Sequence, residues 1–265
     1  MQFEFHSLRL EFTARESLFF PPGKAANTLR GALGTVLDAK VFAPSASGEG
    51  PSGLADPPRP FVFRARHLDG RTIPAGETFH FELNVFSREP EVFVHAFAAL
   101  AEHGIGPGRG KAHLERVAGA DRVSIDLNPA PADIGNIRVE FLSPTELKHE
   151  GRVASEPEFP ILFARIRDRI STLRTLYGAG PLEIDFREIG GHAAAIRMTR
   201  CETQRVDIRR RSSRTGQTHG IGGFTGFAEY EGNLAEFLPW LEAARATGVG
   251  RQAVWGKGEI RLQRL

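Results

Sequence analysis

Cysteine is almost absent from this chain of 265 residues, which has Cys201 alone. A single thiol excludes a disulfide within the chain and a zinc site built from cysteines. No run of about 18 apolar residues occurs, which argues against a membrane-spanning helix. The first twelve residues, MQFEFHSLRLEF, alternate in polarity and do not resemble a secretory signal. We therefore expect a cytoplasmic protein with no membrane association.

Lysine is also scarce, because 29 of the 34 basic residues are arginine, although the net charge is only +2. Arginine suits bidentate contact with phosphate and stacking on rings, but a GC-rich genome also favours it. Genome composition does not explain clustering. Residues 196–214 carry seven arginines against Glu202 and Asp207, a local excess of five positive charges. This cluster favours contact with an extended phosphate backbone, and the alternatives are a solvated pair of strands or a subunit contact.

The first half of the chain predicts the order strand, helix, strand, strand, helix, strand. Apolar alternation predicts a strand over residues 2–12, with a bulge or bend at His6–Ser7 where its phase shifts. Helical spacing predicts helices over 25–40 and 89–104, and alternation predicts strands over 61–68 and 77–86. A glycine loop, 104–110, leads into the fourth strand.

The second half repeats this order. We predict a strand over 136–144 ended by Pro144, a helix over 159–178, one long or two short strands over 193–208, and a strand over 226–232. A helix over 233–248, with Asn233 as its N-cap, and a last strand follow. A repeat with a period of about 130 residues predicts two domains, 1–132 and 133–265. The expected fold is α+β: tandem ferredoxin-like (RRM-like) domains, each β-α-β-β-α-β with an antiparallel sheet.

Glycines surround the last predicted helix. The stretch GIGGFTG, 220–226, lacks the Gly-Lys-Ser/Thr ending of a phosphate-binding loop and precedes a strand instead of a helix. It also lacks the strand–GxGxxG–helix order of a dinucleotide site. A glycine loop beside a sheet and an arginine cluster fits an extended phosphate backbone. The alternative is a tight connection between packed elements.

Two stretches, GIGGFTGFAEYEG (220–232) and FLPWLEAARATGVGRQAVWGKGEI (237–260), resemble the C-terminal glycine-rich signature of the CRISPR-associated endoribonucleases that process repeat transcripts. These enzymes belong to the RAMP superfamily. Similar segments follow in order along the chain: LRGALG (29–34), PRPFVF (58–63), GETFHFELNVF (76–86), GIGPGRGKAHLE (104–115) and FLSPTELK (141–148).

The resemblance implies two ferredoxin-like domains that bind CRISPR repeat RNA and cut precursor transcripts once per repeat, without a metal or other cofactor. The 2′-hydroxyl attacks the adjacent phosphate and gives a 2′,3′-cyclic phosphate. The implied partners are repeat RNA (pre-crRNA) and other CRISPR-associated proteins, and the chain is expected as a monomer or a homodimer.

The site differs from the family pattern, in which catalytic histidines often lie in or just after the first helix. Residues 13–66 contain no histidine, and the loop 43–60 lacks the cysteines of many relatives. Among the nine histidines, His219 precedes the glycine loop and follows the arginine cluster, so we predict it as the catalytic residue. His67, which follows a strand and could face the first helix, is the second candidate.

We predict RNA contacts from the arginine cluster, the glycine loops and the basic residues beside them, and we predict no metal site. The predicted RNA-binding residues are Arg209, Arg210, Arg211, Arg214, Gly222, Gly223, Gly226, Arg251, Lys257, Arg109 and Lys111.

Two other functions stay open. The first is a non-catalytic RNA-binding subunit of a CRISPR effector complex, which the missing first-helix histidine favours. The second is a small-molecule enzyme on a ferredoxin-like scaffold, which would need a deep, mostly apolar pocket in place of a basic groove.

Overall fold

The computed structural model describes residues 1–38, 41, 57–119, 121–131, 134–211 and 218–265. The side chains of Arg210, Arg211 and His219 lie outside what the structure describes.

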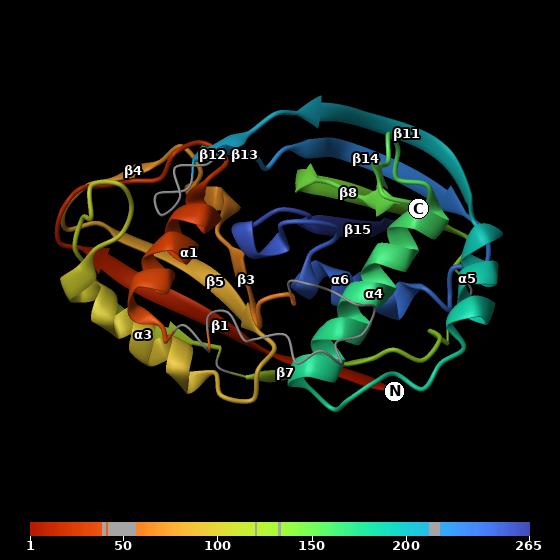
Figure 1. Ribbon diagram of the computed structural model, residues 1–265, viewed down its shortest axis with the longest axis horizontal. Coiled ribbons are helices and arrows are strands. Elements are labelled where there is room, and N and C mark those ends of the chain that lie inside the picture. Colours follow the sequence, from red (N-terminus) through yellow and green to blue (C-terminus); the bar gives the residue numbers. More distant parts are fainter. Residues whose placement is uncertain (39–40, 42–56, 120, 132–133, 212–217) are drawn as a thin grey trace.

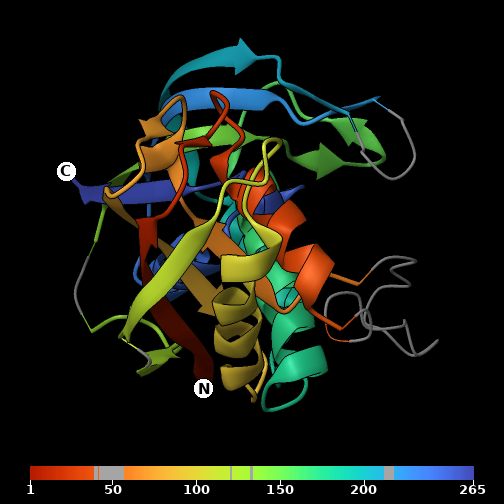
Figure 2. The ribbon, with the colours of Figure 1, turned by 90° about the vertical axis from the view of Figure 1, so that its left-hand side faces the viewer.

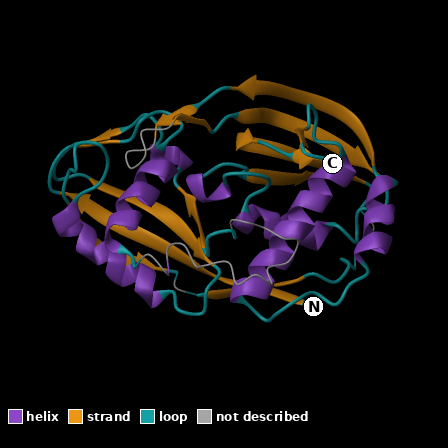
Figure 3. Cartoon of the chain, viewed as in Figure 1, coloured by secondary structure: helices purple, strands orange, loops and turns teal. Residues whose placement is uncertain are grey.

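Two helices cover one face of an antiparallel five-stranded sheet in the first half of the chain (Figures 1 and 3). The strands are β1 (Gln2–Ala14), β3 (Phe61–Arg64), β5 (Thr78–Val85), β6 (Ala112–Ala118) and β7 (Arg122–Asp126). Their order is β3-β5-β1-β6, and β7 also pairs with β1. The helices are α1 (Ala25–Val36) and α3 (Glu91–His103). As predicted, α3 follows Pro90 and ends at Gly104, whose φ is +74°.

The second half builds the same plan, with strands β8 (Asn136–Thr145), β11 (Arg197–Val206), β14 (Gly223–Glu231) and β15 (Ile260–Arg264). The sheet order is β11-β14-β8-β15, and α4 (Phe159–Tyr177) and α6 (Leu238–Thr247) pack on it. In both halves the second, third, first and fourth strands of the repeat lie in that order. The predicted tandem ferredoxin-like fold is confirmed. The predicted boundary after residue 132 falls at residues 132–133, outside the described residues, and stays a prediction.

Short hairpins and turns are added to this plan. The two-stranded pairs are β2 (Leu18–Phe19) with β4 (Thr72–Ile73), β9 (Lys148–His149) with β10 (Arg152–Val153), and β12 (Arg209–Arg211) with β13 (Thr218–Gly220). Two 3₁₀ turns are η2 (Arg66–Leu68) and η3 (Ala253–Trp255).

Helix α5 (Phe186–Ala194) does not appear among the elements predicted from the sequence. Its interior holds Gly190 and Gly191, which lower helix propensity and conceal it. Asp185 is the N-cap of this helix and stabilises its first turn, because its Oδ1 accepts hydrogen bonds from the amides of Arg187 and Glu188 at 2.8 and 3.0 Å. That N-cap was the signal available in the sequence.

The bulge predicted at His6–Ser7 is wrong, and the alternative of a bend there stays a prediction. Strand β1 pairs with β5 without a shift from His6 to Thr13, and its irregularity against β6 lies between Glu11 and Phe12. The apolar phase changes because the two ends of β1 bury opposite faces. Phe3 and Phe5 join the core of the second half, whereas Leu8, Leu10 and Phe12 face α1 and α3.

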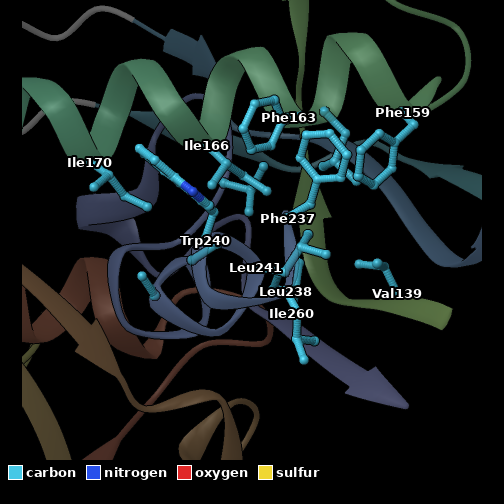
Figure 4. Packing of buried hydrophobic residues seen from close by; sticks show 14 of the residues in the cluster. Val139, Phe159, Phe163, Ile166, Ile170, Phe237, Leu238, Trp240, Leu241 and Ile260 are labelled. Atoms are coloured by element: carbon cyan, nitrogen blue, oxygen red, sulfur yellow. The ribbon is translucent and has the colours of Figure 1, made fainter. Parts of the chain in front are cut away.

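Two separate buried clusters result, one for each sheet. In the second, α4 packs on α6, and the ring of Phe163 lies 4.7 Å from Phe237 and 5.8 Å from Trp240 (Figure 4). Val62 of β3 joins this cluster although its neighbours Phe61 and Phe63 belong to the first. The first sheet therefore contacts the second domain through the face that α1 and α3 leave uncovered.

The carboxyl end of α6 fixes the two halves together. Arg64 donates to the carbonyls of Arg245 and Ala246, and Asn84 Nδ2 donates to the Ala246 carbonyl at 3.1 Å. Arg169 of α4 donates from Nε to the Thr247 carbonyl at 2.7 Å. Side chains from both halves thus satisfy carbonyls that a helix end leaves unpaired.

Burial lowers the pKa of Arg169 to about 10, with a further contribution from the like charge of Arg64.

Among the described residues, no helix is long and apolar enough to cross a membrane.

Candidate nucleic-acid interface

The hairpin formed by β12 and β13, which holds Arg209–Arg211 of the arginine cluster, lies beside the start of α1 in the first half (Figure 1). A Cβ placed on Gly23 would lie 2.8 Å from Cδ1 of Ile208, which directly precedes β12, so the two segments are in contact. The amide of Ile221 donates to the carbonyl of Ile208 at 2.7 Å. Gln252 Nε2 donates to the Gly220 carbonyl at 2.9 Å and ties the hairpin to the glycine turn before β15.

A buried lysine lies beneath this contact. Lys257, in the glycine turn, is only 3% exposed, and its Nζ donates to the carbonyl of Gly23 at 2.9 Å. Asp69 accepts at Oδ1 from the amide of Ala25, the first residue of α1, at 2.8 Å. A cavity of about 80 Å³ is lined by both side chains, together with Arg66 and Trp255.

Burial shifts both ionisable groups toward neutrality. It raises the pKa of Asp69, although the Ala25 amide and the charge of Lys257 act in the opposite direction. Burial likewise lowers the pKa of Lys257, although Asp69 opposes that shift. Through their hydrogen bonds to Gly23 and Ala25, Lys257 and Asp69 connect the glycine turn and η2 to the start of α1.

Cationic side chains surround this junction. The guanidinium of Arg30 on α1 lies 5.6 Å from the ring of Trp255 in η3, a cation–π contact between the two halves. Arg66 is exposed and lies 3.8 Å from Glu259. Three further cations, Lys24, Arg205 and Arg209, form no ion pair with the described carboxylates. The junction thus presents positive charge from α1, η2 and the hairpin region.

Three predicted RNA-binding side chains have partners within the protein. Lys257 is buried as described, which does not favour RNA contact by its ammonium, and its RNA-binding role stays a prediction. Lys111 Nζ donates to the Glu102 carbonyl at the end of α3. Arg251 Nη1 lies 2.6 Å from Oε1 of Glu146, although its side chain is 51% exposed. Each of the three side chains thus contacts a turn or a helix end.

The three glycines of the predicted RNA-binding loop have a structural explanation. A Cβ on Gly226, whose φ is +122°, would lie 2.1 Å from the Glu202 carbonyl oxygen in β11. A Cβ on Gly222 would lie 2.3 Å from the Val206 oxygen, and one on Gly223 would lie 2.4 Å from the Thr145 oxygen. These positions accept only glycine because β14 passes so close to its neighbouring strands.

His67 does not face the first helix, and that expectation is wrong. Its ring stacks on His80 of β5 with 4.7 Å between centroids, on the sheet face opposite α1 and α3. Nε2 of His67 lies 2.8 Å from the His80 carbonyl, so it carries the proton and leaves Nδ1 of the neutral ring as the basic nitrogen. Burial, and next the charge of Arg9, lower the pKa of His80.

His219 lies in β13 and pairs in register with Arg210 of β12, while Arg211 pairs with Thr218. Arg209 begins β12 and is exposed. Arg214 lies outside the described residues. On the first glycine loop, Arg109 is exposed and has a left-handed φ of +48°. Of the arginine cluster, the segment Arg209–Arg211 thus lies in the hairpin at the junction, whereas Arg197 and Arg200 lie in the first half of β11 and pair with Glu231 and Glu202.

Sequence reasoning missed Lys24, Arg66 and Asp69. Lys24 follows Pro21-Pro22-Gly23 at the start of a helix, a position that frequently binds anions. Nothing local marked Arg66 or Asp69, because their partners Glu259 and Lys257 lie almost 200 residues away. Among the described residues, no group of three or more potential metal ligands occurs.

Comparison with known proteins agrees with this architecture. Residues 139–260 match the family model of the CRISPR-associated endoribonuclease Cas6. Residues 39–129 match a second model, described as an N-terminal domain. No curated relative matches the chain. The resemblance to the CRISPR-associated repeat-processing endoribonucleases is thereby confirmed, and the family match supports an RNA-cleaving enzyme.

Solved structures share the fold over the whole chain. A product complex of a Thermus thermophilus Cas6 is 18% identical, with a TM-score of 0.63 over 98% of this chain and 100% of that one. A second Cas6 product complex is 17% identical, with a TM-score of 0.62 over 98% and 99%. The chain also matches a partial complex of Cas6-RT-Cas1 with Cas2 at 12% identity and a TM-score of 0.61, covering 99% of this chain and 46% of that one.

Proposed function

We propose that this chain, whose residues 139–260 match the Cas6 endoribonuclease family, is a metal-independent endoribonuclease that binds CRISPR repeat RNA and cuts precursor transcripts into crRNA in the cytoplasm. The observation that carries the proposal is the position of the β12–β13 hairpin. It brings Arg209–Arg211 of the arginine cluster beside the start of α1 in the other domain, above the buried Lys257. An extended RNA strand crossing this junction would meet cations from both domains.

The proposed reaction is transesterification within the RNA. A base removes the proton of the 2′-hydroxyl, the 2′-oxygen forms a bond to the adjacent phosphorus, and the bond from phosphorus to the 5′-oxygen breaks. An acid gives a proton to the leaving 5′-oxygen, so the products are a 2′,3′-cyclic phosphate and a 5′-hydroxyl. This chemistry needs an acid, a base and positive charge beside the phosphorane.

We assign the proton transfer to His219, and His67 is the alternative candidate. His219 lies on the hairpin that meets α1, whereas His67 lies on the uncovered sheet face and has only Nδ1 free to accept a proton. Lys24, Arg66 and Arg209 are exposed or half-buried cations of the junction, and we assign them to the phosphates. Of the predicted contacts, Arg109 would meet the RNA further along the first domain.

Purified protein and end-labelled repeat RNA test the proposal. A second RNA carries a single 2′-deoxynucleotide 5′ to the cleaved bond and is the matched control. We expect one cut in the ribose substrate and none in the deoxy substrate, with equal binding of both. Cleavage of the deoxy substrate at the same bond would overturn the mechanism.

A second candidate function is a non-catalytic RNA-binding subunit of a CRISPR effector complex. The observation that favours it is that α1 carries no histidine in any of its twelve residues. Binding of repeat RNA without any cut would support this function. The junction cavity of about 80 Å³, in contrast, is far smaller than the roughly 300–1,000 Å³ of a small-molecule site.

A further inference from the structure

Phe19 is an exposed aromatic residue next to the basic junction. Its side chain is 51% exposed, the largest exposed fraction of any aromatic residue that the structure describes. Single exposed apolar residues are common on protein surfaces. The surroundings of Phe19 therefore have to decide whether it has a role.

The short β2–β4 pair holds Phe19 outward. Leu18 pairs with Ile73, and both are buried, whereas Phe19 pairs with Thr72, and both are exposed. The strand alternation and the anchored Leu18 therefore fix the direction of the ring. Its backbone is supported by the first glycine loop, because a Cβ on Gly106 would lie 3.5 Å from the Phe19 carbonyl oxygen. The ring therefore projects from the exposed side of the β2–β4 pair, where one face can receive a ligand.

The Phe19 ring lies among cations and close to the junction. The amide of Phe20 donates to the carbonyl of Arg71 at 2.9 Å, which places the exposed Arg71 directly before the adjacent strand β4. The loop of Gly106 also carries the exposed Arg109. Four residues along the chain, Gly23 contacts the β12–β13 hairpin through Ile208, so Phe19 lies at most ~14 Å from that contact.

We propose that Phe19 stacks on one unpaired base of the bound RNA. The site takes a single-stranded nucleobase, because an aromatic face beside Arg71 and Arg109 combines stacking with phosphate neutralisation. This inference rests on the proposed function and extends its RNA path from the junction to the first domain. The other exposed aromatic, Phe186, is 40% exposed and lies under the guanidinium of Arg167 at 5.0 Å, so its face is already covered.

The test uses repeat RNAs that carry 2-aminopurine at successive positions, with wild-type protein and the variants Phe19→Ala, Phe19→Leu, Phe19→Trp and Phe186→Ala. We expect wild-type protein to quench 2-aminopurine at one position. Phe19→Ala should abolish that quenching and weaken binding by roughly 5- to 150-fold. Phe19→Leu should also lose the quenching, because it keeps apolar area without a ring, whereas Phe19→Trp and Phe186→Ala should retain it.

The outcomes separate this inference from the proposed function. If wild-type protein and Phe19→Ala bind and cut repeat RNA equally, with the same quenching, the stacking site is refuted and the nuclease proposal stands. If Phe19→Leu quenches like wild type, the contact is not ring stacking and the inference is likewise refuted. If wild-type protein neither binds nor cuts the RNA, the proposed function fails and the stacking site fails with it.

Discussion

Gly258 in the turn before β15 offers a direct test of how the junction is built. Its φ is +68°, and a Cβ there would lie 1.9 Å from the carbonyl oxygen of Val249 and 2.7 Å from its nitrogen. The amide of Val249 also donates to the carbonyl of Gly258 at 2.9 Å. A side chain at this position would push the two arms of the turn apart, and Lys257 lies next to it.

The cost of Gly258→Ala follows from these contacts. The left-handed backbone costs an alanine about 1–2 kcal/mol, and loss of the Val249 hydrogen bond costs about 0.5–1.5 kcal/mol more. We therefore expect the free energy of unfolding to fall by roughly 1.5–3.5 kcal/mol. For a chain of this size, that fall lowers Tm by roughly 3–14 °C.

Gly31→Ala is the matched control. Gly31 lies inside α1, its φ is not in the left-handed range, and a Cβ there meets no atom within 4 Å. Because alanine favours a helix over glycine, this variant should gain about 0.5–1 kcal/mol. Thermal unfolding followed by circular dichroism measures both. Equal Tm values for Gly258→Ala and wild type would refute the argument, because the turn would then accept a side chain.

The remaining predictions concern the interface itself. His219→Ala should lower the single-turnover cleavage rate by at least about 100-fold while His67→Ala leaves it near wild type; the opposite order would move the base to the sheet face. Arg209→Ala should weaken RNA binding and reduce the slope of log Kd against log salt by about one, and an unchanged slope would remove Arg209 from the RNA path. Because burial raises the pKa of Asp69, its stabilising effect is full below pH 3.8 and is lost as the pH rises through the raised pKa. Asp69→Asn, which keeps an acceptor for the Ala25 amide, should therefore gain in unfolding free energy relative to wild type as the pH rises above about 4, and a difference that stays constant with pH in urea titrations would contradict this.

The fold was predictable from the sequence where one element buries one face. The apolar residues of α4 lie on one face of the helix, and those of β5 alternate with polar residues. Each pattern predicts burial against a single core, and both elements formed near the expected bounds. Strand β1 was harder, because Phe3 and Phe5 face the second domain and break the pattern of Leu8 and Leu10. A phase shift in one sequence does not distinguish a bulge from a strand that serves two cores.

The site was predictable only in part, because its interactions are long-range. The sequence marked the arginine cluster and the glycine turns, but it did not predict the β12–β13 hairpin or the contact between Ile208 and Gly23. The sequence did not show that Lys257 turns inward to the Gly23 carbonyl, since that partner is 234 residues away. Arg251 and Lys111 likewise find partners that no local pattern indicates. A basic residue beside a glycine is thus as well suited to hold a turn together as to bind RNA.

The most direct measurement for the central proposal is the chemistry of the RNA ends produced from a CRISPR repeat in EDTA. Purified protein should cut the repeat once, and mass spectrometry should find a 2′,3′-cyclic phosphate on the 5′ fragment and a 5′-hydroxyl on the 3′ fragment. Tight binding without a cut, or fragments that end in a 3′-hydroxyl and a 5′-phosphate, would contradict it.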